Sequence, residues 1–256
     1  MRILFEYPLA LCAISFIALS TSVWIGATFL SRSRGVEVDT HEEFSTILAA
    51  TLTLLGLIIG FTFSMAISRY DQRKNLEEEE ANAIGTEYVR ADLLPAADGA
   101  KVRKLLKEYL NLRLRFYEAP RDIEIIKAIA VERGRLQGEL WRAILGPAAA
   151  QPTPIVTLVV AGMNDVLNAE GYTQAAWWNR IPHAAWLLMI FIAICSNLLL
   201  GYGARKARSE VLLLLVLPAV VSISFFLIAD IDSPRGGVIH VSPQNLQSLA
   251  DSLGGP

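Results

Sequence analysis

Carboxylates are the side chains of this sequence that are best placed to do chemistry. Four consecutive glutamates run from Glu77 to Glu80, and two aspartates, Asp230 and Asp232, stand near the end of the chain. Carboxylates attract cations, so a residue such as Glu78 would form an acidic ring if several copies surrounded one axis. In a single chain, such a run is typical of a solvated helix face, which is the simpler interpretation. For the two aspartates, the simpler interpretation is a helix end in headgroup water.

No arrangement of residues points to an enzyme or to a metal site. His41, His183 and His240 lie far apart, without a metal-ligand spacing, and both cysteines lie inside apolar runs. We find no HExxH pair, Walker loop, GxSxG turn or dinucleotide glycine motif. We therefore expect no catalytic residue, no metal and no cofactor. A net charge of −2 and the lack of a basic stripe interleaved with aromatics also argue against a nucleic-acid partner.

Apolar runs dominate the composition. The chain has 256 residues, of which 53% are hydrophobic, and its mean hydropathy is +0.41. A bilayer core of about 30 Å needs about 20 apolar residues in a helix. The sequence contains four charge-free runs of that order: Tyr7–Ser31, Phe44–Ser68, Ile181–Ala204 and Val211–Ala229. We therefore predict four transmembrane helices.

The remaining sequence predicts a helical domain between the second and third spans. Apolar residues recur at helical spacing from Val102 to Leu110 and again from Ile125 to Ile144, so two amphipathic helices are expected to pack together. The predicted fold class is an all-α membrane protein with four transmembrane helices and a helical cytoplasmic domain. Its expected parts are residues 1–68 (helices 1 and 2), 69–180 (helical domain), 181–230 (helices 3 and 4) and 231–256 (tail).

Basic residues near the spans give the expected orientation. Arg69, Arg73 and Lys74 directly follow the second span, and the loop before that span is mostly acidic, which favours a cytoplasmic helical domain. Both termini would then be cytoplasmic as well. The difference between the two faces is small. The face with the helical domain carries Arg2, Arg69, Arg73, Lys74, Arg180 and Arg235 near the membrane, and the opposite face carries Arg32, Arg34, Arg205, Lys206 and Arg208.

The second span is predicted to continue into water as one helix, because no proline or turn signal occurs before Leu94-Pro95. One side of this helix carries small and polar residues. Taken alone, the stripe favours close packing of another helix against Gly56, Gly60 and Ser64. The alternative is that the stripe faces water and lines a pore. Arg69, Asp71 and Arg73 are expected to anchor the helix where it leaves the bilayer. The stripe contains Thr46, Ala49, Thr53, Gly56, Leu57, Gly60, Ser64, Asp71, Asn75, Glu78 and Asn82.

At GFTFSMAISRYDQRKN the sequence resembles the bestrophin channels, and more closely the bacterial bestrophin-like membrane proteins. The Gly60-Phe61 pair precedes Arg69 at the spacing found in bestrophin second helices. In the tail, the turn of Asp232, Pro234 and Gly236 is similar to the Asn-Pro-Phe-Gly turn after the last bestrophin span, with Arg235 replacing the aromatic residue. The order of elements agrees over almost the whole chain.

This resemblance implies a homopentamer in the lipid bilayer of a bacterial inner membrane, which passes inorganic ions through one central pore. Its neck would be lined by Thr53, Leu57 and Phe61, and its vestibule and interface would carry the charges Arg69, Asp71, Arg73 and Glu78. The neck departs from the family's pattern because Thr53 is polar and Leu57 is aliphatic. The calcium-binding acidic cluster is missing, so we expect no calcium control. The alternative is a non-conducting membrane scaffold or sensor whose helical domain binds a partner.

Overall fold

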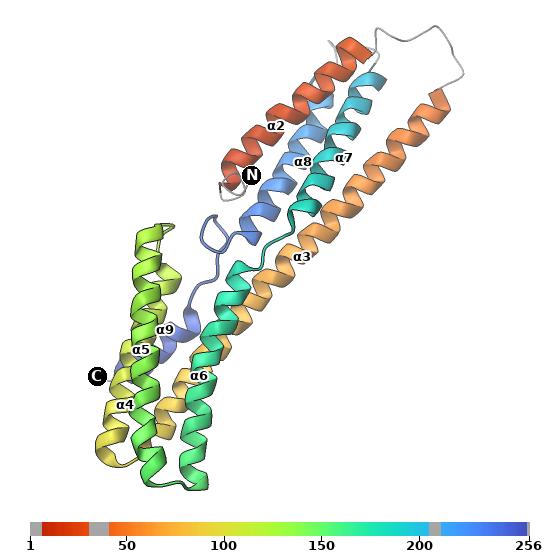
Figure 1. The fold of residues 1–256 in the computed structure, drawn as a ribbon. Coiled ribbons are helices and arrows are strands. Elements are labelled where there is room, and N and C mark those ends of the chain that lie inside the picture. Colours follow the sequence, from red (N-terminus) through yellow and green to blue (C-terminus); the bar gives the residue numbers. More distant parts are fainter. Residues whose placement is uncertain (1–6, 31–40, 205–210, 255–256) are drawn as a thin grey trace. The chain divides into compact units, whose positions relative to one another are not determined.

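The computed structural model describes residues 7–30, 41–204 and 211–254, and these form helices with no strand among them (Figure 1). Arg32, Arg34, Arg205, Lys206 and Arg208 lie outside the described residues. In order, the helices are α2 (Pro8–Ile25), the π-helical η1 (Gly26–Leu30), α3 (His41–Arg90), the 3₁₀ turn η4 (Ala91–Leu93), α4 (Ala96–Glu118), α5 (Ile123–Ala150), α6 (Pro154–Trp178), α7 (His183–Gly203), α8 (Val211–Asp232) and α9 (Gln244–Gly254).

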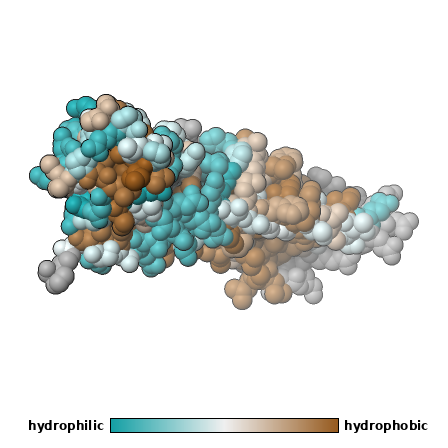
Figure 2. All heavy atoms as spheres, turned by 90° about the horizontal axis from the view of Figure 1, so that it is seen from below, coloured by the Kyte–Doolittle hydropathy of each residue, from teal (hydrophilic) through white to brown (hydrophobic). Residues whose placement is uncertain are grey.

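Four helical stretches are long and apolar enough to cross a membrane. They lie within Pro8–Leu30, Glu43–Leu93, Pro154–Gly203 and Leu212–Asp232. The predicted all-α membrane fold with four spans is therefore confirmed, and the chain is an integral membrane protein. In Figure 2, brown hydrophobic residues cover most of the visible surface around these spans, as lipid contact requires.

The described chain divides into two compact units. The membrane unit contains the residues up to Arg69 and those from Arg180 to His240, and the helical unit contains Tyr70–Asn179 and the residues from Val241 onward. Helix α3 runs from one into the other. Its 50 residues make it about 75 Å long at 1.5 Å per residue. The continuous helix predicted from the absence of proline is confirmed. It ends at Arg90, and the turn η4 continues to Leu93, before Leu94, which is extended ahead of Pro95.

In the membrane unit, α2 packs against α7 and α8. Helix α7 meets α2 and η1 closely at two glycines, Gly26 of η1 and Gly201 of α7. A Cβ at Gly26 would overlap the backbone of Leu198, and a Cβ at Gly201 would overlap that of Val23. Small residues let helix backbones approach closely in lipid, where van der Waals packing replaces the hydrophobic effect as the driving force.

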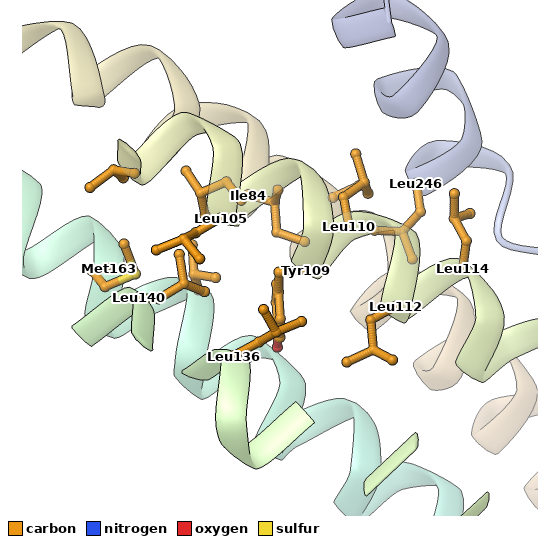
Figure 3. Packing of buried hydrophobic residues seen from close by; sticks show 14 of the residues in the cluster. Ile84, Leu105, Tyr109, Leu110, Leu112, Leu114, Leu136, Leu140, Met163 and Leu246 are labelled. Atoms are coloured by element: carbon orange, nitrogen blue, oxygen red, sulfur yellow. The ribbon is translucent and has the colours of Figure 1, made fainter. Parts of the chain in front are cut away.

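In the helical unit, apolar side chains from α3, α4, α5, α6 and α9 share one core (Figure 3). Tyr109 and Leu110 of α4 are fully buried there with Leu136 of α5 and Leu246 of α9. The two predicted amphipathic helices are thus confirmed as packing partners. Ile125 is the exception, because it lies in the first turn of α5 and is exposed.

Candidate functional site

The stripe predicted on α3 is an open surface of the chain. Leu57 is 52% exposed and Phe61 is 66% exposed, and a Cβ added at Gly56 or Gly60 would meet no described atom within 4 Å. The glycines therefore do not mediate contact with another described helix of the same chain, so the stripe is available to a second copy, lipid or water. Every predicted member is exposed: Thr46, Ala49, Thr53, Gly56, Leu57, Gly60, Ser64, Asp71, Asn75, Glu78 and Asn82.

The opposite side of α3 faces the interior of the chain. Leu55, Thr62 and Ala66 are buried in the membrane unit, and charged residues continue the same buried side in the helical unit. Arg73 is one of them. It is only 1% exposed, so it lies on the buried side of α3 and not on the exposed stripe. Arg69 is half-buried, whereas Asp71 and Glu78 are exposed on the stripe.

The glutamate run is split between the two sides. Four consecutive helical residues point in four directions, 100° apart, so Glu78 and Glu79 are exposed while Glu77 and Glu80 are buried. The interpretation of the whole run as a solvated face is wrong for the buried pair. Glu77 accepts hydrogen bonds from Asn245 Nδ2 at 2.7 Å and from the backbone N–H of Leu246 at 2.9 Å. Its carboxylate thus caps the N-terminus of α9.

Glu80 belongs to a buried ionic network that joins four helices. The guanidinium of Arg113 (α4) forms two hydrogen bonds to it, with Nη2 at 3.2 Å from Oε2. Thr173 Oγ1 (α6) also donates to Oε2 at 3.2 Å. Burial raises the pKa of Glu80, and Arg113 opposes that shift. Glu170 (α6) extends the network, since it pairs with Arg133 of α5.

The sequence pattern did not predict this network, although Arg113 carried a signal. It lies three residues after Leu110 on the apolar stripe of α4, at a position where the pattern predicts a core residue. A cation at a core position implies a buried anion nearby. Its partner Glu80 stands 33 residues earlier, in a run that looked solvated.

The tail turn is built around two buried aspartates. Asp230 accepts hydrogen bonds from the backbone N–H groups of Val238 at 2.9 Å and Ile239 at 2.8 Å. Asp232 accepts the N–H of Ile181 at 3.2 Å. Their exposed fractions are 1% and 5%, so the expectation of carboxylates in headgroup water is wrong.

The rest of the turn is held locally. Ser233 Oγ accepts the N–H of Gly236 at 3.2 Å, and Pro234 is buried. Gly237 has φ +156°, and a Cβ there would overlap the Asp230 carboxylate. Within residues 7–30, 41–204 and 211–254, no three His, Cys, Asp or Glu side chains are grouped closely enough to hold a metal ion.

The described part of the chain forms helices without a strand, and four of these helices are of membrane length. Its 50-residue helix has an exposed polar stripe, and a buried turn follows the last span. These are the features of a bestrophin fold. The bestrophin-like domain family matches residues 13–246. The chain therefore belongs to the bestrophin-like family, and the resemblance drawn from the sequence is confirmed. No curated protein matches the chain in sequence.

Solved structures give the same fold. A bacterial bestrophin homolog from Klebsiella pneumoniae with a leucine-to-threonine mutation is 13% identical, with a TM-score of 0.63, and the match covers 94% of this chain and 97% of that chain. Its tryptophan-to-alanine variant gives 13% identity and a TM-score of 0.64, over 96% and 94% of the two chains. Its tyrosine-to-alanine variant gives 15% identity and a TM-score of 0.63, and the match covers 99% of this chain and 98% of that chain.

Proposed function

We propose that this protein is a passive ion channel formed by several copies of the chain, with α3 of each copy lining one central pore. The observation that carries the proposal is the exposed stripe of α3. It brings small and polar residues together on one side of a membrane-spanning helix, and Gly56 and Gly60 on it contact no other described part of the chain. A lone helix in lipid gains nothing from such a side, whereas a water-filled pore requires one.

The proposed neck of the pore consists of Thr53, Leu57 and Phe61. These residues recur every fourth position, so their side chains follow one another along the helix. The two apolar members are more than half exposed in the single chain, as pore-lining residues must be before assembly. A ring of each would narrow the water path, and a narrow apolar constriction stops ions by losing its water. The channel would open when the α3 helices separate there.

Beyond the neck, Asp71 and Glu78 extend the stripe into the helical unit. Both are exposed, and neither belongs to the buried network of Glu80. In a ring of copies each would repeat around the axis and raise the local concentration of cations. This arrangement favours cations weakly.

The proposed assembly is a homopentamer in the bacterial inner membrane, with the helical units forming a cytoplasmic vestibule. The family supports it, because bestrophins include pentameric channels with this order of elements. The uncovered glycines of α3 support it independently, since a closed ring of copies gives their side of the helix water to face.

Recording from purified protein in planar bilayers tests the proposal. Leu57→Ala together with Phe61→Ala widens the neck, so basal conductance should rise. Ile47→Ala is the matched control, because Ile47 is an exposed apolar residue of α3 outside the stripe. An asymmetric salt gradient gives the charge selectivity through the reversal potential. Equal leakage from the neck variant and the control would remove the neck assignment.

The alternative is a non-conducting scaffold or sensor, in which the helical unit binds a partner. The mass of the protein in nanodiscs separates the two functions. A pentamer is required by the channel, while a monomer or dimer leaves α3 without a closed ring and favours the scaffold.

A further inference from the structure

Glu87 is a buried carboxyl group in the part of α3 that lies in the helical unit. Its exposed fraction is 0%, and neither of its oxygens has a hydrogen-bond partner among the described residues. It differs in this from Glu77 and Glu80, which are buried on the same side of the helix with donors at hydrogen-bond distance. A carboxylate without donors is costly in such a place, whereas a neutral carboxyl is much less so.

Gly162 of α6 makes the space that Glu87 occupies. A Cβ at Gly162 would overlap Glu87 Oε2 and Arg90 Nη1, so any other residue would displace both side chains. Arg90 also reaches α6, where its Nη1 donates to the carbonyl of Leu158 at 3.4 Å. Helices α3 and α6 therefore meet through one carboxyl group and one guanidinium fitted around a glycine.

Few charges surround this carboxyl group. Burial raises the pKa of Glu87 to about 8, with Arg90 opposing the shift and Asp165 of α6 adding to it. The turn η4 also contacts α6, and its Asp92 forms an ion pair with Arg103 of α4. The carboxyl is thus neutral at low pH and ionises on the alkaline side of neutrality.

We propose that Glu87 is a proton-binding site that holds α3 and α6 together in the helical unit. The neutral carboxyl packs against Gly162 and keeps the two helices closed. On ionisation the carboxylate moves out of this space towards water, and the α3–α6 contact around Gly162 loosens. Coupling of this contact to conduction rests on the proposed function, because α3 is also the proposed pore helix.

The size of the effect follows from linkage between proton binding and opening. In the closed state the pKa is about 8, and in an open state with a solvated carboxyl it returns to about 4.5. Because the closed pKa is raised, the stability that the proton provides is fully present below about pH 4.5 and is lost as pH rises towards 8. Between pH 6 and pH 8 the equilibrium constant for opening should therefore increase roughly 50-fold.

Hydrogen–deuterium exchange of the full chain in nanodiscs measures this opening directly. Amides of α6 on either side of Gly162 should lose roughly 50-fold in protection between pH 6 and pH 8, after correction for intrinsic exchange. In Glu87→Gln, which keeps the neutral shape, protection should be nearly independent of pH. Glu79→Gln, an exposed neighbour, should behave as the wild type.

A second variant keeps the test decisive. Gly162→Ala fills the space of the carboxyl group and displaces it towards water, so the protection of α6 should no longer depend on pH. Protection in the wild type that does not change with pH, or a pH dependence that survives Glu87→Gln, overturns the proposal. The exchange readout requires no ion flux, so a failure of the channel hypothesis would be seen separately in the bilayer recordings.

Discussion

Removing the positive charge of Arg113 should destabilise the helical unit far more than removing the charge of Arg115, two residues along the same helix. The side chains of Arg113 and Glu80 are 1% and 0% exposed, whereas Arg115 is 60% exposed and pairs with Glu132 at 3.2 Å. Deleting one partner of a buried pair leaves an uncompensated charge and costs about 3–5 kcal/mol. An exposed pair contributes about 0–1 kcal/mol.

Arg113→Met is the suitable change, because methionine is an unbranched, uncharged side chain that removes the guanidinium, whose Cζ lies 4.4 Å from the centroid of the Phe116 ring. For a unit of this size, the loss should lower the midpoint of thermal unfolding by roughly 10–20 °C. Combining it with Glu80→Gln removes both charges and should restore most of the loss, because no buried ion remains without its partner.

The pH dependence of Arg113→Met gives a second measurement. Burial already raises the pKa of Glu80, and the variant removes the cation that opposed this shift. When the pKa of a carboxyl group is higher in the folded state than in the unfolded state, binding of the proton stabilises the fold. This stabilisation is fully present below the unfolded pKa of about 4.5 and is lost as the pH rises. The variant should therefore be closest to the wild type near pH 5 and furthest from it above neutrality.

Thermal unfolding of the full chain in detergent, followed by intrinsic fluorescence, provides the assay. Trp177 lies 4.8 Å from Phe116 between ring centroids, so it reports on this region. Arg115→Met is the control and should shift the midpoint by no more than a few degrees. Equal midpoints for the two arginine variants would refute the buried pair as a source of stability.

Two further measurements test the membrane unit and its orientation. Gly201→Ala should lower the unfolding midpoint, because its Cβ would overlap α2, whereas Gly171→Ala should leave it unchanged or raise it, since its Cβ meets nothing and alanine favours a helix. A single cysteine at Val131, which is 76% exposed, should react with an impermeant maleimide only after the inner membrane is permeabilised, in a chain whose two cysteines are replaced by alanine. Labelling of intact cells would place the helical unit outside.

Much of the fold followed from local patterns. Runs without charge identify the spans because charged groups are costly in lipid, and this cost depends on composition alone. Likewise, α3 could be predicted as one helix because nothing from Phe44 to Arg90 breaks it. The members of its stripe could be grouped by the 3.6-residue period.

The charged residues could not be assigned in the same way. Arg73 and Glu80 look like surface residues in the sequence, and both are buried because their side of α3 packs against other helices. Asp232 looks like a helix end in water, yet it accepts the N–H of Ile181, which is 51 residues away. The partners of Glu80 and Asp232, which are Arg113 and Ile181, are distant in the chain, so no local window contains them.

The sequence by itself determined that this chain crosses a membrane, that α3 is continuous and that one side of α3 differs from the rest. The tertiary structure alone decided which glutamates are buried, that Gly26 and Gly201 lie against the backbones of Leu198 and Val23, and that Glu87 lies against Gly162. The physical reason is that helix formation and lipid solubility depend on neighbouring residues. Burial of a charge depends instead on whether another helix places a group of opposite charge or a hydrogen-bond donor next to it.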